Sequence, residues 1–72
     1  MEELMQALKK KYESEVDIAN ATIKVYLEKP VGVSEHSHFA EEVDKQLEII
    51  GCALDKIKVI NKYYPSEDEI PF

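Results

Sequence analysis

Arginine and tryptophan are both missing from this 72-residue chain. All nine cationic side chains are lysines, and fifteen carboxylates outnumber them, which gives a formal net charge of −6 at pH 7. Proteins that read phosphates and base edges rely heavily on the planar guanidinium group of arginine. The one basic cluster, Lys9–Lys11, is followed at once by carboxylates at 13, 15 and 17. Direct nucleic-acid binding is therefore disfavoured, and the cluster is interpreted as part of a solvated helix face.

Cysteine and long apolar runs are scarce as well. Cys52 is the only cysteine, so a disulfide within the chain is excluded and a reduced, packed thiol is expected. No apolar run approaches the roughly 20 residues that a membrane-spanning helix needs. Glu2 and Glu3 stand where an export signal requires basic residues. These features predict a cytoplasmic protein without membrane contact.

Glycine and proline do not occur between Glu2 and Glu28. Over this span apolar residues recur every three or four positions, as expected for one face of a helix. The stripe comprises Met5, Leu8, Tyr12, Val16, Ala19, Ile23 and Leu27. A helix over about residues 2–29 is predicted, because Pro30 disfavours helical geometry in the residue before it.

A second helix is predicted over about residues 38–64, after a connector at 30–37. Ser34 or Ser37 is the expected capping residue, and Pro65 ends the helix. The apolar stripe of this helix is expected to comprise Val43, Leu47, Ile50, Leu54, Ile57 and Tyr64. Gly51 interrupts it at a cost of about 1 kcal/mol relative to alanine, which a close helix approach, or room for a ring such as that of Tyr12, would offset.

Two helices of similar length with a short connector form an antiparallel hairpin. We therefore predict one all-α domain, with the hairpin at 1–64 and an acidic tail at 65–72. A domain this small buries a small core, so a partner chain is expected to help stabilise it. Extra apolar residues lie beside the main stripes, and one partner helix cannot cover both sets. They predict self-association, as a dimeric four-helix bundle, through Leu4, Ile18, Val25, Ile49, Ala53 and Ile60.

Residues of catalytic type gather only at Glu35–His38. His38 has carboxylates at one-turn spacing, but a zinc site needs three or four converging ligands. His36 and His38 are therefore assigned to the start of the second helix and not to metal binding. The neighbouring serines lack a buried acid and a glycine-rich oxyanion turn. We predict that the chain is not an enzyme and has no cofactor, metal site or small-molecule substrate.

The tail combines acids with an apolar end. Glu67, Asp68 and Glu69 precede a final Ile-Pro-Phe. A solubilising role would explain the acids, but not two large apolar residues and a proline beside them. The segment resembles the acidic C-terminal tip of bacterial single-stranded-DNA-binding proteins, which ends in Ile-Pro-Phe.

That resemblance implies a docking function on replication and repair enzymes. By position, Phe72 would be the anchor in an apolar pocket, and its terminal carboxylate would meet a basic side chain. Ile70 and Pro71 would shape the anchor. The acids Glu67, Asp68 and Glu69 would steer the segment to a basic rim. The rest of the chain has no likeness to the oligonucleotide-binding β-barrel of that family.

The body of the chain carries a second resemblance. The segment Ala21–His36, centred on the connector sequence Pro-Val-Gly-Val-Ser-Glu-His, is similar to a family of small helical-hairpin proteins of T-even-type phages. These proteins are the companions encoded with the recombination helicase UvsW. The likeness spans most of the chain and implies a helical hairpin in phage DNA recombination.

Together these features predict a non-enzymatic phage accessory protein that binds proteins of DNA recombination, repair or replication, with Glu67–Phe72 as its docking peptide. Three alternatives remain open. The chain could be a weak nucleic-acid binder that uses Lys9–Lys11, or an acidic nucleic-acid mimic, which the interleaved lysines argue against. It could also be a structural oligomerising hairpin without a recognition tail.

Overall fold

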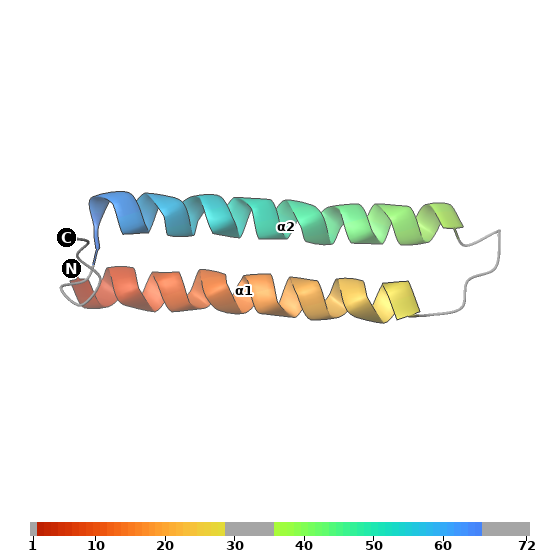
Figure 1. Cartoon of the computed structure of the whole chain (residues 1–72), viewed down its shortest axis with the longest axis horizontal. Helices are drawn as coiled ribbons and strands as arrows, with labels where there is room; N and C mark the ends of the chain where they lie inside the picture. The colour runs from red at the N-terminus through yellow and green to blue at the C-terminus, as the bar shows by residue number, and fades with distance from the viewer. Residues whose placement is uncertain (1, 29–35, 66–72) are drawn as a thin grey trace.

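The chain folds into two antiparallel helices that lie side by side (Figure 1). Helix α1 spans Glu2–Glu28 (27 residues) and helix α2 spans His36–Tyr63 (28 residues). A computed structural model describes residues 2–28 and 36–65; of residues 36 and 37 it describes the backbone only. The all-α helical hairpin predicted from the sequence is confirmed.

The helix boundaries agree closely with the residues that favour or stop a helix. Helix α1 begins with Glu2 and Glu3, whose negative charges suit the positive end of the helix dipole, and it ends two residues before Pro30. The last turn of α2 contains Lys62, a favourable charge there. The backbone N–H of Tyr64 donates to the carbonyl oxygen of Ile60 at 2.7 Å and closes that turn.

The start of α2 differs slightly from the prediction. The helix begins at His36, about two residues earlier than expected, so Ser37 lies inside the helix and does not precede it. The alternative capping residue, Ser34, lies outside the described residues. The connector predicted at 30–37 is likewise outside them for residues 30–35.

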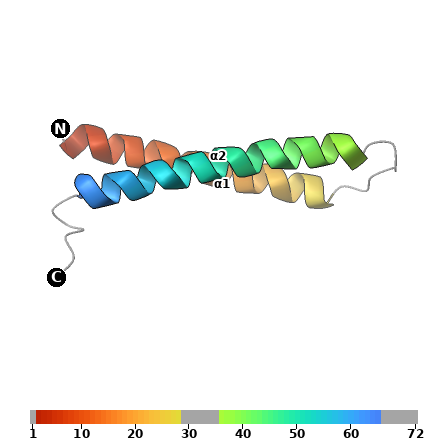
Figure 2. The ribbon, with the colours of Figure 1, turned by 90° about the horizontal axis from the view of Figure 1, so that it is seen from above.

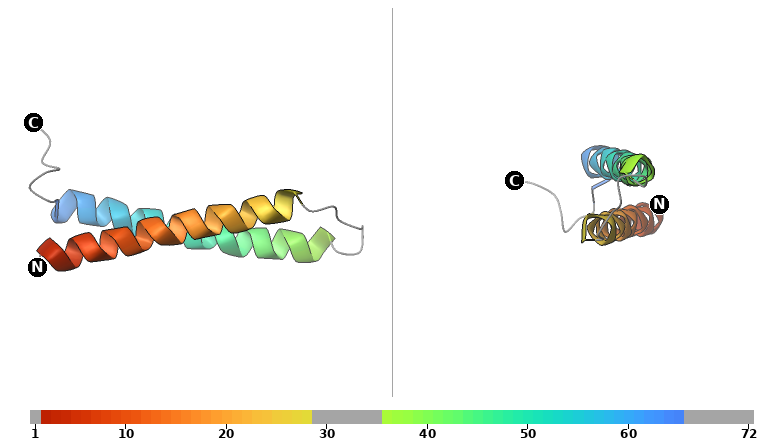
Figure 3. Two further views of the ribbon diagram at one scale, coloured as in Figure 1. Left: turned by 90° about the horizontal axis from the view of Figure 1, so that it is seen from below. Right: turned by 90° about the vertical axis from the view of Figure 1, so that its right-hand side faces the viewer.

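The two helices cross at a shallow angle and stay close along their length (Figures 2 and 3). Each is about 40 Å long at 1.5 Å per residue. Grooves lie between the helices on both sides of this contact. Both ends of the described chain, Glu2 and Pro65, lie at the same end of the hairpin (Figure 1).

The contact between the helices follows alternating steps of three and four residues, the spacing of a coiled-coil seam. All residues of this core stripe are buried or half-buried. On α1 it comprises Met5, Leu8, Tyr12, Glu15, Ala19, Thr22 and Tyr26, and on α2 Phe39, Val43, Gln46, Ile50, Ala53, Ile57 and Ile60. The most deeply buried members are the two alanines, Ala19 and Ala53, each 1% exposed.

The predicted stripes were partly wrong. Leu27, Leu47 and Leu54 are 74%, 55% and 51% exposed, so they lie outside the helix contact. Ala53 and Ile60, which were predicted to lie beside the main stripe, are buried in it. Three seam positions hold the polar residues Glu15, Thr22 and Gln46. Each of the three leucines follows a seam residue by one position, so its side chain points away from the partner helix.

Gly51 was expected to allow a close approach of the helices. It is exposed instead, and a Cβ built on it would have no heavy atom within 4 Å. The close approach is made two residues later, at Ala53. Within the hairpin, therefore, no packing requirement explains the glycine.

Candidate interaction surfaces

The histidine segment was the only predicted cluster of chemically active residues. His38 is exposed, and the side chain of His36 is not described. Glu42, one turn after His38, accepts a 3.3 Å ion-pair hydrogen bond from Lys45 Nζ on its own helix. Within the ranges 2–28 and 38–65, no three His, Cys, Asp or Glu side chains converge as metal ligands would.

The predicted docking segment begins after the helical body has ended. Helix α2 ends at Tyr63, and Pro65 is the last described residue. Residues Glu67, Asp68, Glu69, Ile70, Pro71 and Phe72 therefore lie outside the described residues. The role assigned to them stays a prediction.

Four of the residues predicted for self-association lie together on one side of the hairpin. Ile18 and Ile49, from opposite helices, line one groove of about 280 Å³ with Glu15, Ala19 and Gln46. Leu4 and Val25 fall on the same face as Ile18 because they are separated from it by whole multiples of seven residues. These aliphatic side chains are 42–64% exposed.

This surface includes two residues that the sequence interpretation did not assign to it. Cys52 lines a groove with Ile49 and Glu15, and Val59 follows Cys52 by seven residues. Both are exposed. Their spacing from Ile49, three and ten residues, was the available signal. We call the whole surface the open apolar face: Leu4, Ile18, Val25, Ile49, Cys52 and Val59.

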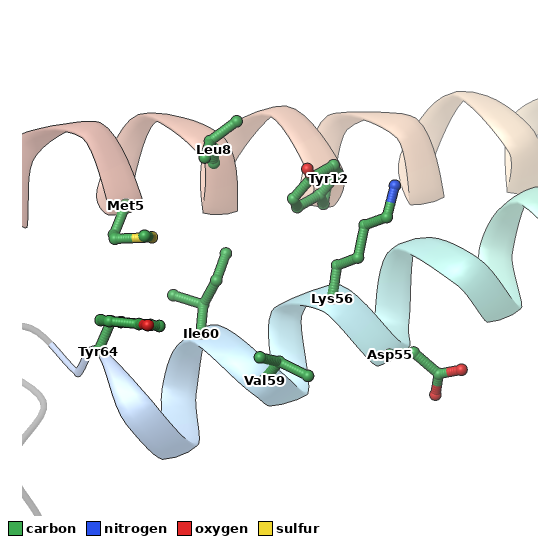
Figure 4. A pocket seen from close by; sticks show the side chains of 8 residues that line it. All are labelled: Met5, Leu8, Tyr12, Asp55, Lys56, Val59, Ile60 and Tyr64. Atoms are coloured by element: carbon green, nitrogen blue, oxygen red, sulfur yellow. The ribbon is translucent and has the colours of Figure 1, made fainter.

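At the end of the hairpin where α1 begins, this side of the molecule is hollowed into a pocket of about 370 Å³ (Figure 4). Met5, Ile60 and Tyr64 point into the space between the helices, Leu8 lies over the ribbon of α1, and Asp55 points away from α1. The other lining residues are Tyr12, Lys56 and Val59. The pocket is thus mainly apolar.

Two lysines lie near the phenol ring of Tyr12 at the inner end of this pocket. Lys56 Nζ lies 5.0 Å from the ring centroid and comes from α2, and Lys11 Nζ lies 5.7 Å away and comes from α1 itself. Both distances fall within the range of cation–π attraction. The two ammonium groups therefore put positive charge beside the apolar pocket.

The groove on the opposite side of the hairpin is shorter and more acidic at its rim. Val16, Leu54 and Ile57 line it together with Glu13 and Asp17. Leu47 and Ile23 extend its apolar part. Toward the start of α1 the positions in register with them are Lys9 and Asn61, whereas in the other direction Ala40 is in register with Leu47, and the exposed Leu27 follows Ile23 by one turn. This side therefore offers an apolar patch from the middle of the hairpin to the end of α1.

Charge is distributed unevenly along the hairpin. The half formed by residues 2–13 and 54–65 carries six lysines and four carboxylates, whereas the half formed by residues 14–28 and 36–53 carries two lysines and seven carboxylates. The helical halves thus have formal net charges of +2 and −5, without Glu67, Asp68 and Glu69, which follow Pro65 in the sequence. Opposite ends of two copies would attract one another.

Neither α1 nor α2 is long and apolar enough to cross a membrane. Comparisons with known proteins do not place the chain in a family: no protein-family model, curated protein or solved structure matches it.

Proposed function

We propose that this chain is a non-enzymatic accessory protein that docks on proteins of DNA recombination, repair or replication. The helical hairpin is the scaffold, and Glu67–Phe72 is the docking peptide. The single observation that carries the proposal is the sequence of that segment, three acids followed by Ile-Pro-Phe. Its resemblance to the tips of bacterial single-stranded-DNA-binding proteins supplies the class of partner.

The arrangement of the described residues supports this proposal in two ways. Helix α2 ends at Tyr63, before the docking peptide begins in the sequence. The grooves described above are open and largely apolar, which suits contact with another macromolecule better than the sheltering of a small substrate. The resemblance of Ala21–His36 to the UvsW-companion family adds a setting in phage DNA recombination.

The chemistry of the docking peptide predicts a division of roles. Phe72 would enter an apolar pocket of the partner and its terminal carboxylate would meet a cationic side chain. An aromatic anchor of this kind commonly contributes 2 kcal/mol or more to binding. Glu67, Asp68 and Glu69 would chiefly raise the association rate through long-range attraction to a basic rim.

Binding to a purified enzyme that recognises the tips of single-stranded-DNA-binding proteins tests the proposal. Full-length chain should displace a fluorescent tip peptide from that enzyme, and the Phe72→Ala variant should compete at least about tenfold less well. Leu47→Ala is a matched control, since it also removes an exposed apolar side chain, but from the hairpin. Equal competition by all three proteins would contradict the docking role.

A second measurement separates the anchor from the acids. Replacing Glu67, Asp68 and Glu69 by their amides should slow association and flatten its dependence on salt, with little change in the dissociation rate. Amidation of the terminal carboxylate should instead speed dissociation. If both changes act on the same rate constant, the assignment of separate roles is wrong.

A further inference from the structure

We propose that the open apolar face is covered by a second copy of this chain, in an antiparallel arrangement with its two-fold axis at Ile49. This inference concerns the hairpin alone and does not rest on the docking function of Glu67–Phe72. It assigns the face, the orientation of the two copies and the residues that meet.

The amount of exposed surface favours a second copy. The chain exposes 5796 Å², whereas a compact folded protein of 8.3 kDa exposes about 4,600 Å². The excess, taken over all 72 residues, is about 1,200 Å², more than the roughly 800 Å² per partner that a standard protein–protein interface buries. In the described residues no large side chain is fully buried. A partner of this size would supply the missing core.

The pattern of exposed side chains selects the face. Leu4, Ile18 and Val25 extend along α1 for about 32 Å at 1.5 Å per residue. Ile49, Cys52 and Val59 accompany them on α2. On the opposite side the apolar residues of α1 run only from Val16 to Leu27, about half of that length, so this side could cover less of a partner helix. The open apolar face is therefore the longer continuous surface for helix packing.

The distribution of charge selects the orientation. A parallel pair would bring together two ends of formal charge −5, whereas an antiparallel pair places each −5 end against a +2 end. An antiparallel two-fold pair is also closed, so it does not continue into a filament. Two hairpins paired in this way form a four-helix bundle.

The two-fold axis follows from the midpoint of the face. Ile49 lies near the middle of α2 and lines two adjoining grooves. An axis there would pack Ile49 on Ile49 of the other copy. Positions seven residues to either side would exchange places, so Lys56 of each copy would lie at the level of Glu42 of the other. Both positions are on the same side of α2 as Ile49.

The same symmetry places α1 of one copy against α1 of the other, because a two-fold axis across the helices pairs each helix with its own counterpart. Ile18 lines a groove together with Ile49. It would therefore lie near the axis and approach Ile18 of the other copy.

Sedimentation of the full-length chain at micromolar concentration tests the face. The wild-type protein should have the mass of two chains. Ile49→Glu should weaken association at least about 100-fold, because it places a carboxylate at the centre of an apolar contact. Leu47→Glu is the matched control: it lies two residues away on the other side of α2, is exposed like Ile49, and should leave the dimer intact. Circular dichroism reports whether each variant keeps its helices.

Cross-linking tests the position of the axis without a destabilising charge. In a Cys52→Ser background, Ile49→Cys should be joined to its counterpart by a short bismaleimide in high yield. Leu47→Cys in the same background should not be joined. This measurement decides the proposal even if Ile49→Glu fails to fold.

Charge exchange tests the orientation. Lys56→Glu and Glu42→Lys should each weaken the dimer about tenfold, because each creates two repelling pairs across the two-fold axis. The double variant should regain most of the lost affinity. A monomer at all concentrations, a dimer lost with Leu47→Glu but not with Ile49→Glu, or a double variant no better than the singles would each overturn the proposal.

Discussion

The rings of Tyr26 and Phe39 meet edge to face, with centroids 5.1 Å apart and an interplanar angle of 79°. Tyr26 is in the last turns of α1 and Phe39 in the first turns of α2, so this contact joins the helices beside the connector. Edge-to-face geometry places the positive edge of one ring against the negative face of the other. The pair closes the seam at the end of the hairpin away from the chain termini.

Removing either ring should destabilise the hairpin, and the two losses should not add. We expect each alanine substitution to lower the free energy of unfolding, with a coupling energy of about 0.5–1.5 kcal/mol between Tyr26 and Phe39. Urea unfolding of the wild type, both single variants and the double variant measures it. Protein concentration is held fixed, since association alters apparent stability. Strict additivity would show that the rings contribute only through the area they bury.

Enlarging a seam alanine should be costly. Ala19 and Ala53 are each 1% exposed, so a leucine at either position would force the helices apart and lower stability by about 1–3 kcal/mol. Ala40→Leu is the control, because Ala40 is exposed on α2. Thermal unfolding followed by circular dichroism should separate the seam variants from the control. If Ala19→Leu unfolds at the same temperature as the wild type, the helices are not closely packed at this position.

Gly51→Ala should stabilise the chain. The added methyl group would meet no heavy atom within 4 Å in the hairpin, and alanine removes the entropic cost of a glycine inside a helix. We expect a gain of about 0.5–1 kcal/mol in unfolding free energy. A loss of stability would indicate that something outside the hairpin packs against Gly51.

Zinc should leave the thermal unfolding curve unchanged. His38 is exposed, and in the described part of the chain no three potential ligands converge. A metal that bound the folded state would raise the melting temperature in proportion to its affinity. Unfolding with and without equimolar zinc makes the comparison, and His38→Ala identifies the ligand if a shift occurs. A large upward shift would reverse the structural assignment of the histidines.

Deleting Ile70–Phe72 should weaken binding to the partner and leave the free energy of unfolding nearly unchanged. These residues lie outside both helices of the described fold, and α2 has ended at Tyr63. We expect helicity to be unchanged and unfolding free energy to shift by less than about 0.5 kcal/mol. If the deletion instead lowers the melting temperature markedly, the segment belongs to the core and the docking proposal loses its support.

Local signals in the sequence specify the two helices and the residues at which they end. The span without glycine or proline, the three-and-four spacing of apolar residues and the positions of Pro30 and Pro65 predicted both elements to within about two residues. These signals are local, because each acts on the geometry of its own turn. Similar helix lengths then left an antiparallel hairpin as the simplest arrangement. The sequence also predicted that four residues lie beside the main stripe, and all four are exposed: Leu4, Ile18, Val25 and Ile49.

The packing of the two helices selects which of two adjoining stripes forms the seam. Each helix carries an apolar residue beside nearly every seam position, and hydrophobicity alone favoured Leu47 and Leu54 over Gln46 and Ala53. The alanines lie in the seam because small side chains let the two helix backbones approach closely. Leu47 and Leu54 are therefore exposed. Ala53 and Ile60, which were predicted for self-association, are buried in the seam instead. Which face is buried is a property of two helices packed together, and neither helix specifies it alone.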